Sequence, residues 1–340
     1  MTGTETVQSF NVPNYSGLLY NKANTKTPFL NMISGGVKYT NSVEFVCGQF
    51  YTSEEGEIPE ISETASLTAP TATFVTRSQM SNVTQIFMDS VAISYAKQSN
   101  MATLSGVNLA GQVANPQDEL SFQVARKMEK LKRSIEKTFI QGTYNKAAKD
   151  TEVNKTRGMV SAITTNTIDA KSAKLDLWLV NEIVEKIYNA GGDISNLVLL
   201  MNSTNLLQLH GDAVELGMPI GKEYMSVYGI QVRDLILPVG TTVRCALGEF
   251  IPAGTVLVIN PSVIGPVEQP VPGKGNFFLE ELAKTGAGTK YQLFGQIGLD
   301  HGPEWFHGKI TGLSTEFTKP VGKKVVAVTE TATASTTTGK

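Results

Sequence analysis

The feature that most constrains the fold is a long amphipathic segment that ends at Gln141. Its apolar residues are spaced by 4, 4, 3, 4 and 4 positions, the repeat of one face of an α-helix: Leu120, Val124, Met128, Leu131, Ile135 and Phe139. Asn115 can cap this helix, Pro116 suits its first turn, and Gly142 can end it. A helix over residues 116–141 is on the order of 40 Å long, so its apolar face packs along an equally long surface.

The remaining faces of this helix are strongly basic. They carry six cations and only two carboxylates: Arg126, Lys127, Lys130, Lys132, Arg133 and Lys137 against Glu129 and Glu136. We therefore expect these faces to be exposed to water while the apolar face is buried.

An acidic loop between two β-rich segments is the second informative feature. Residues 42–51 and 71–88 are rich in β-branched and aromatic side chains and are predicted to be strands. The loop 52–70 between them contains no basic residue and five glutamates: Glu54, Glu55, Glu57, Glu60 and Glu63. We predict a long two-stranded ribbon with an acidic tip, which is only marginally stable unless it packs on a partner.

The remaining segments indicate an α+β chain. Residues 1–41 show no sustained period, which is typical of an extended arm and not of a core. A helix is predicted at 175–190, a buried strand at 197–201 and a short helix at 203–209. Further strands, separated by Gly and Pro, are predicted at 229–232, 242–247, 255–259, 290–297 and 309–313. The tail, 319–340, is rich in Thr, Ala and Val and need not belong to the core.

Composition and motifs argue against several classes of protein. The 29 Lys and Arg residues nearly balance 31 Asp and Glu, so the chain has no net basic field for nucleic acid or an anionic membrane. The N-terminus has no signal-peptide pattern, and no run of about 18 apolar residues occurs. Cys47 and Cys245 are expected to be buried and unpaired. P-loop, GxGxxG, HExxH and GxSxG motifs do not occur, so we expect no catalytic residue, cofactor or metal.

One cluster of ionisable residues requires a choice between two interpretations. Asp300, His301, Glu304 and His307 could gather around a metal ion. A Gly-Pro pair at 302–303 breaks the helical spacing that would fix such ligands, so a hairpin turn with aromatic packing is the favoured interpretation. His210, which follows an apolar run, is interpreted as a structural histidine.

The acidic loop and the basic helix are complementary. Taken singly, each is ordinarily a solvated surface, since exposed ion pairs contribute little. In a protein that packs against copies of itself, an acidic ribbon on a neighbour's basic helix would fix orientation. We therefore predict inter-subunit contacts between the glutamates of the loop and four cations of the helix: Arg126, Lys127, Lys130 and Arg133.

The order of these segments resembles the major capsid proteins of tailed bacteriophages, which share the Johnson fold. The resemblance covers most of residues 15–315 and includes local sequence around the arm, the ribbon's return, the long helix and two later segments: 27–30, 41–45, 77–94, 125–142, 178–192 and 282–292. It implies an N-terminal arm (1–41), an extended loop (42–95), a peripheral domain with the spine helix (96–174), an axial domain (175–270), a return to the peripheral domain (271–318) and a tail (319–340).

The resemblance also implies a function. The chain would be a structural head subunit that self-assembles into hexamers and pentamers of an icosahedral shell around double-stranded DNA. Its partners would be itself, portal, scaffold and decoration proteins, and packaged DNA without sequence-specific contact; no membrane is implied. It would be located in the virion after assembly in the host cytoplasm. Some family members crosslink through a lysine on the extended loop, but no lysine occurs between Lys38 and Lys97, so noncovalent contacts are expected here.

Three alternatives remain open. The same fold could form a cellular nanocompartment that encloses an enzyme, and particle contents would distinguish the two shells. The chain could be another ring-forming virion component, which electron microscopy would separate from closed shells. It could also be a metal-dependent hydrolase that uses the His301–His307 cluster, and metal analysis would test this.

Overall fold

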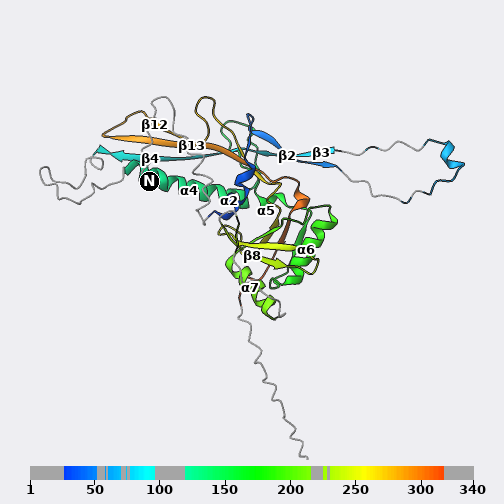
Figure 1. Ribbon diagram of the computed structural model, residues 1–340. Coiled ribbons are helices and arrows are strands. Elements are labelled where there is room, and N and C mark those ends of the chain that lie inside the picture. Colours follow the sequence, from blue (N-terminus) through cyan, green and yellow to red (C-terminus); the bar gives the residue numbers. More distant parts are fainter. Residues whose placement is uncertain are drawn as a thin grey trace, which may run out of the picture.

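Two large β-sheets and a separate two-stranded ribbon organise the computed structural model (Figure 1). The structure describes residues 27–51, 58, 60–69, 74, 77–95, 119–215, 225–227 and 230–317. Helices cover the sheets, and the strands run in both parallel and antiparallel pairs. The α+β class expected from the sequence is therefore confirmed.

The first sheet is built around the long strand β13 (Gly288–Asp300). One edge of β13 pairs antiparallel with β4 (Gln85–Ser94), and the other edge pairs with two shorter strands in succession. These are β12 (Phe278–Leu282) and β11 (Gly265–Glu268), and β1 (Lys38–Tyr39) extends the sheet beyond β11. The sequence predicted only 290–297 of β13, and it did not predict β1, β11 or β12.

The predicted long helix is α4 (Glu119–Gln141), which lies along β4 beneath this sheet (Figure 1). Its predicted apolar face is confirmed, because all six stripe residues are buried or packed against the main core. The predicted cap at Asn115 lies outside the described residues. The expectation that all other faces are exposed is wrong for Lys132, which is 6% exposed, and for Glu136, which is fully buried.

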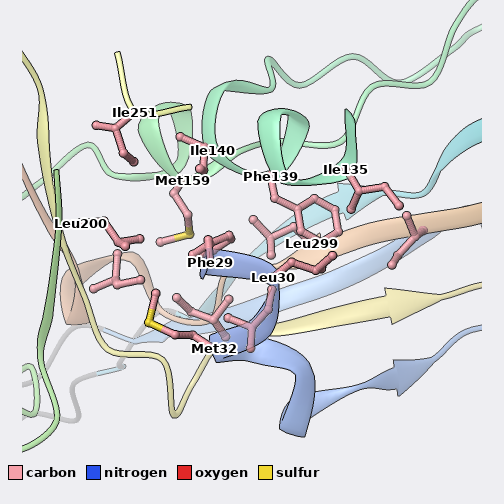
Figure 2. Close-up of a cluster of buried hydrophobic side chains, with 14 of the residues drawn as sticks. Phe29, Leu30, Met32, Ile135, Phe139, Ile140, Met159, Leu200, Ile251 and Leu299 are labelled. Atoms are coloured by element: carbon pink, nitrogen blue, oxygen red, sulfur yellow. The ribbon is translucent and has the colours of Figure 1, made fainter. Parts of the chain in front are cut away.

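The segment that buries Glu136 is the short helix α2 (Pro28–Ile33), and every residue of this helix is buried. Figure 2 shows Phe29, Leu30 and Met32 packed among side chains of α4, α5 (Met159–Ala162) and β13. The expectation that residues 1–41 lie outside the core is therefore wrong for 28–33; residues 1–26 lie outside the described part. A six-residue helix that is buried on all sides has no amphipathic period by which to recognise it. The turn η1 (Ser34–Gly36) then leads to β1.

The second sheet has seven strands and is covered by α6 (Leu177–Asn189) and α7 (Ser203–Glu215). The predicted α6 is confirmed, and α7 is six residues longer than the predicted 203–209. The sheet order is β5 (Thr167–Asp169), β14 (Gly308–Thr311), β10 (Val256–Ile259), β6 (Val198–Met201), β9 (Thr242–Leu247), β8 (Ile230–Ile236) and β7 (Met225–Val227). Leu199 and Met201 of β6 join the core under α6 and α7, whereas Leu200 joins the core around α2. Both faces of this sheet are therefore buried at β6.

The ribbon consists of β2 (Glu44–Tyr51) and β3 (Arg77–Val83) and extends away from the body (Figure 1). The prediction of a single strand at 71–88 is wrong, because the ribbon ends at the Glu44–Val83 pair and β4 begins at Gln85 in the other sheet. Strand-forming residues continue on both sides of Thr84, so composition does not mark this break. Strand β2 has a bulge at Gly48, where φ is +63°. A Cβ added to Gly48 would lie 3.0 Å from the Gly302 carbonyl oxygen.

Candidate functional site

The far end of the ribbon carries the acidic loop. Glu60 and Glu63 are exposed there, whereas Glu54, Glu55 and Glu57 lie outside the described residues. The same end exposes large apolar side chains that the sequence did not single out. These are Ile58, Ile61, Leu67 of the turn η2 (Ala65–Leu67), and Phe74, which are 70–93% exposed. A tip that is both acidic and apolar is suited to contact with another protein surface.

The predicted basic contact residues of α4 already have partners within the chain. Lys127 and Lys130 both donate to the Asp89 carboxylate of β4, each at 2.9 Å. Arg126 pairs with Glu129 at 3.0 Å along the helix. Arg133 forms an ion pair with Glu249, which lies in the loop after β9. Sequence reasoning therefore identified the cations but missed both of the carboxylates that reach them from elsewhere in the fold.

A signal for Asp89 was present in the sequence. Phe87, Val91 and Ile93 of β4 point into the core, and Asp89 shares their alternation. A carboxylate at an inward position of a strand requires a cation from the helix packed on that face of the sheet. Glu249 had no such signal, because it lies in a loop.

The ionisation of Asp89 follows from these contacts. Burial acts to raise the pKa of this carboxyl, but the hydrogen bonds from Lys130, Lys127 and the Ser90 N–H together outweigh burial and hold the pKa below its usual value. A group with a depressed folded-state pKa contributes stability above its unfolded pKa and loses it as the pH falls through the folded value. The two ion pairs of Asp89, with Lys127 and Lys130, thus stabilise the packing of β4 on α4 at neutral pH.

Replacing Asp89 with asparagine is expected to lower the free energy of unfolding by about 1 kcal/mol at pH 7, because both lysine contacts are partly exposed. The difference from the unaltered chain should shrink as the pH falls below about 4. Urea unfolding at pH 7 and at pH 3 measures both effects. Asp150→Asn, at an exposed position, is the control, and an equal loss in both variants would contradict the assigned role.

A shallow groove of about 420 Å³ follows the exposed side of α4. It is bounded by the loop that carries Glu249 and Phe250, and its lining is mostly basic: Arg126, Glu129, Lys130, Arg133, Ser134, Lys137 and Phe250. The Arg133 guanidinium lies 5.5 Å from the centre of the Phe250 ring, and Gln141 Nε2 donates to the Phe250 carbonyl at 2.6 Å. These two contacts hold the loop against the helix.

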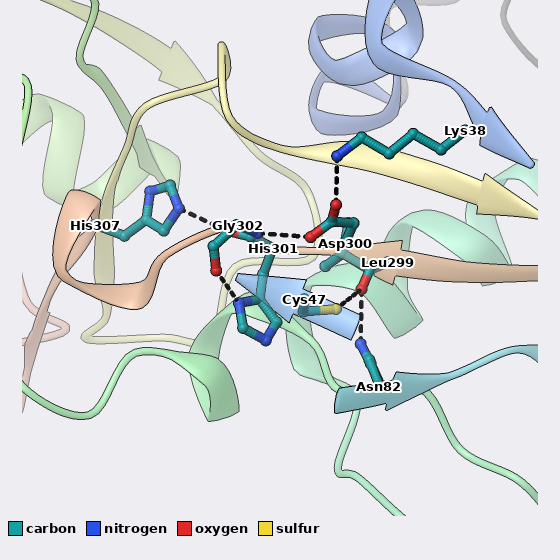
Figure 3. A network of polar contacts seen from close by, with 8 residues as sticks. All are labelled: Lys38, Cys47, Asn82, Leu299, Asp300, His301, Gly302 and His307. Atoms are coloured by element: carbon teal, nitrogen blue, oxygen red, sulfur yellow. Dashed lines mark hydrogen bonds and ion pairs between the residues drawn. The ribbon is translucent and has the colours of Figure 1, made fainter. Parts of the chain in front are cut away.

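The Asp300–His307 cluster is part of the buried scaffold. It links β13 to β14 in the other sheet through the 3₁₀ turn η3 (Glu304–Phe306), so the predicted hairpin is wrong. The aromatic contact is present, with 6.2 Å between the Trp305 and Phe306 ring centres. Figure 3 shows Asp300 paired with Lys38 at 2.5 Å and accepting from the Gly302 N–H. In the part of the chain that the structure describes, no group of three metal-ligating side chains comes together.

The two histidines of this cluster make their bonds within the protein. His307 Nδ1 accepts from the Asn260 N–H at 3.1 Å, so Nε2 carries the proton and donates to the His301 carbonyl at 2.8 Å. Burial lowers the pKa of His307 to about 4, which keeps the ring neutral. Burial also lowers the pKa of His301, whose Nδ1 donates to the Gly302 carbonyl at 2.7 Å. The hydrogen bonds of the two rings stabilise the segment that leads from β13 in one sheet to β14 in the other.

The other residues that the sequence singled out are placed as follows. Cys47 and Cys245 are both buried, and neither is part of a disulfide. His210 lies half-buried on α7. Among the described helices, none is long and apolar enough to cross a membrane.

Comparison with known proteins identifies a family. The sequence model of a family described as SU10 major capsid protein matches residues 2–314. No curated protein matches the chain significantly. Similar solved structures include the capsid asymmetric unit of cyanophage A-1(L), with a TM-score of 0.59, 13% identity, and coverage of 88% of this chain and 98% of that one.

Two further structures extend the comparison. A Mycobacterium phage Patience structure has a TM-score of 0.55 at 11% identity, covering 93% of this chain and 96% of that one. The holo-SrpI encapsulin complex from Synechococcus elongatus PCC 7942 has a TM-score of 0.57 at 12% identity, covering 93% of each chain. At such low identity these likenesses establish the fold alone, and phage capsids and an encapsulin share it.

Proposed function

The chain belongs to the SU10 major capsid protein family, and from this premise we propose how its surfaces hold neighbouring copies together. It is a structural protein of a phage virion and a subunit of the self-assembled head shell. The likeness to an encapsulin concerns the fold alone, whereas the family match favours a phage head over a nanocompartment. The expectation of a Johnson-fold major capsid protein is thereby confirmed.

The proposed shell is icosahedral, is built from hexamers and pentamers, and encloses double-stranded DNA. The observation that carries this proposal is the ribbon, whose tip exposes glutamates and large apolar residues far from the body of its own chain (Figure 1). Such a tip is stable when a neighbouring copy covers it. The proposed division into arm, extended loop, peripheral domain, axial domain and tail describes the parts that meet in this packing.

The proposed inter-subunit contact sets the acidic loop of one copy on the basic face of α4 of the next. Its donors are Arg126, Lys130 and Arg133, which remain partly or largely exposed despite their internal partners. Lys127, also predicted as a contact, is two-thirds buried and binds the same Asp89 carboxylate as Lys130. Its role in the contact is therefore indirect.

Charge reversal at Arg126 and Lys130 together, to glutamate, is expected to abolish closed shells while leaving the subunit folded. The glutamates would repel the acidic tip of the neighbouring copy. Electron microscopy of the full-length chain, expressed with its neighbouring genes, measures shell formation, and circular dichroism checks the fold. Lys171→Glu with Lys174→Glu, at exposed positions away from α4, is the matched control. Normal shells from the Arg126 and Lys130 variant would refute this contact.

Further partners and properties are proposed from family membership. The shell would join portal and scaffold proteins and accept decoration proteins, and assembly would take place in the host cytoplasm. Packaged DNA would be enclosed without sequence-specific contact, which agrees with a chain whose formal net charge is −2. We propose no catalytic activity, because the ionisable groups of the Asp300–His307 cluster bond to the protein itself.

A further inference from the structure

A carboxylate from a loop of the same chain pairs with one of the cations that line the groove along α4. Glu249 reaches Arg133 from the loop after β9, and the two side chains are 47% and 40% exposed. Phe250 lies beside it, held by the Gln141 hydrogen bond and by the Arg133 guanidinium. The groove therefore shows, within one chain, how an acidic residue followed by a large apolar one can sit against this helix.

We propose that this groove receives residues 60–63 of a second copy's ribbon and that Glu249 is a built-in competitor for Arg133. The inference rests on the proposed contact between ribbon and helix, and it specifies how the strength of that contact is limited. In the free subunit, Glu249 pairs with Arg133, the cation that a carboxylate of the second copy would bind.

The lining of the groove matches those residues in charge. Arg126, Lys130, Arg133 and Lys137 recur at i, i+4, i+7 and i+11, so they form one stripe of about 16 Å on the helix. Glu60 and Glu63 are exposed at the ribbon tip and would face this stripe. Among the described residues, three carboxylates pair with these four cations: Glu129 with Arg126, Asp89 with Lys130 and Glu249 with Arg133, which leaves a net positive charge on the stripe.

The lining also matches in apolar surface. Ile61, between the two glutamates, is 70% exposed, and Phe250 forms an apolar wall beside Arg133. An isoleucine placed on that ring would be removed from water while its flanking carboxylates reach the cations. The combination of an apolar centre and an ionic border is the usual composition of a protein interface.

The competing role of Glu249 follows from the chemistry of Arg133. A guanidinium has five N–H donors in a planar fork, so it can bind a second carboxylate beside the first. The negative charge of Glu249 nevertheless reduces the attraction for a second anion. Removing this charge therefore strengthens the contact between subunits, whereas an ordinary supporting ion pair would weaken the protein when removed. The two roles predict effects of opposite sign.

The experiment measures the concentration at which the full-length chain assembles, by sedimentation of shells across a dilution series. Glu249→Gln is expected to lower this concentration about two- to fivefold, the range for one exposed ionic contact. The effect should diminish at high salt. Glu182→Gln is the matched control, because Glu182 is also an exposed carboxylate paired with a lysine, Lys186 on α6. An unchanged or higher concentration for Glu249→Gln overturns the competitor role.

A charge exchange identifies the occupant of the groove. Glu60→Lys with Glu63→Lys should prevent assembly, and adding Arg126→Glu with Lys130→Glu should restore shells if the ribbon occupies the groove. Failure to restore them, with all variants folded, would overturn the ribbon as occupant and indicate another acidic partner or nucleic acid. If Arg126→Glu with Lys130→Glu alone assembles normally, the proposed function of the helix face itself fails. The competitor and the contact are thus tested separately.

Discussion

Replacing Glu136 with alanine is expected to lower the free energy of unfolding by about 3–5 kcal/mol. The Glu136 carboxyl is fully buried and accepts hydrogen bonds from the Phe29 and Leu30 N–H groups, at 2.9 and 2.7 Å. It thereby satisfies the first turn of α2, which is buried with it (Figure 2). Alanine would leave both N–H groups without a partner, at a cost of about 1–3 kcal/mol each, and would also leave a cavity.

The same carboxyl makes stability depend on pH. Burial raises the pKa of Glu136 to about 8; the two N–H bonds act to lower it, and Glu249 adds to the rise. A folded-state pKa above the unfolded value of 4.5 means that the native state holds the proton more tightly. The stability from this group is therefore fully present below pH 4.5 and is lost as the pH rises toward 8. Between pH 5.5 and 7.5 the loss is about 2–3 kcal/mol.

Urea unfolding of the unassembled subunit at pH 5.5 and 7.5 measures both effects. Glu136→Gln should remove most of the pH dependence, because glutamine does not titrate. The control is Glu129→Gln, which makes the same chemical change two turns earlier on α4 at a partly exposed position. A pH dependence that persists in Glu136→Gln would show that another group is responsible. A small effect of alanine would show that water replaces the carboxyl.

Glu136 also illustrates what the sequence could reveal. The spacing of apolar residues identified the helix, its core face and its end at Gln141, since these depend on neighbours in sequence. That spacing could not reveal that Lys132 is buried, nor that Glu136 is covered by α2, which lies about 100 residues earlier in the chain. Contacts between distant segments are set by packing and leave no periodic trace when the covering segment is six residues long.

The candidate site was predictable to a similar extent. Composition identified the acidic loop and the basic helix, because charge is read directly from residues. It did not identify Asp89 and Glu249, which neutralise part of the basic face after folding. The Asp300–His307 cluster shows the reverse problem, since a set of residues suggestive of a metal site turns out to be bonded within the scaffold.

Replacing Asn82 with alanine is expected to lower the free energy of unfolding by about 3–5 kcal/mol. Asn82 is fully buried at the base of the ribbon, and its side chain makes four hydrogen bonds. Its amide donates to the carbonyls of Leu299 and Arg157, at 2.7 and 3.2 Å, and its oxygen accepts from the N–H groups of Arg157 and Val83. Figure 3 shows the bond to Leu299, whose carbonyl also lies 3.6 Å from the Cys47 sulfur.

The position of these bonds gives the substitution a consequence for assembly. Asn82 joins the ribbon to β13 and to the segment after α4, so it fixes the direction in which the ribbon leaves the body. A subunit that still folds without this side chain should hold its ribbon less rigidly and form fewer closed shells, because ordering the ribbon on a neighbour then costs more entropy. Thermal unfolding and electron microscopy measure the two effects. Asn196→Ala, the same change at a partly exposed position, is the control. If Asn82→Ala lowers stability but still forms normal shells, Asn82 contributes to the stability of the subunit and not to assembly.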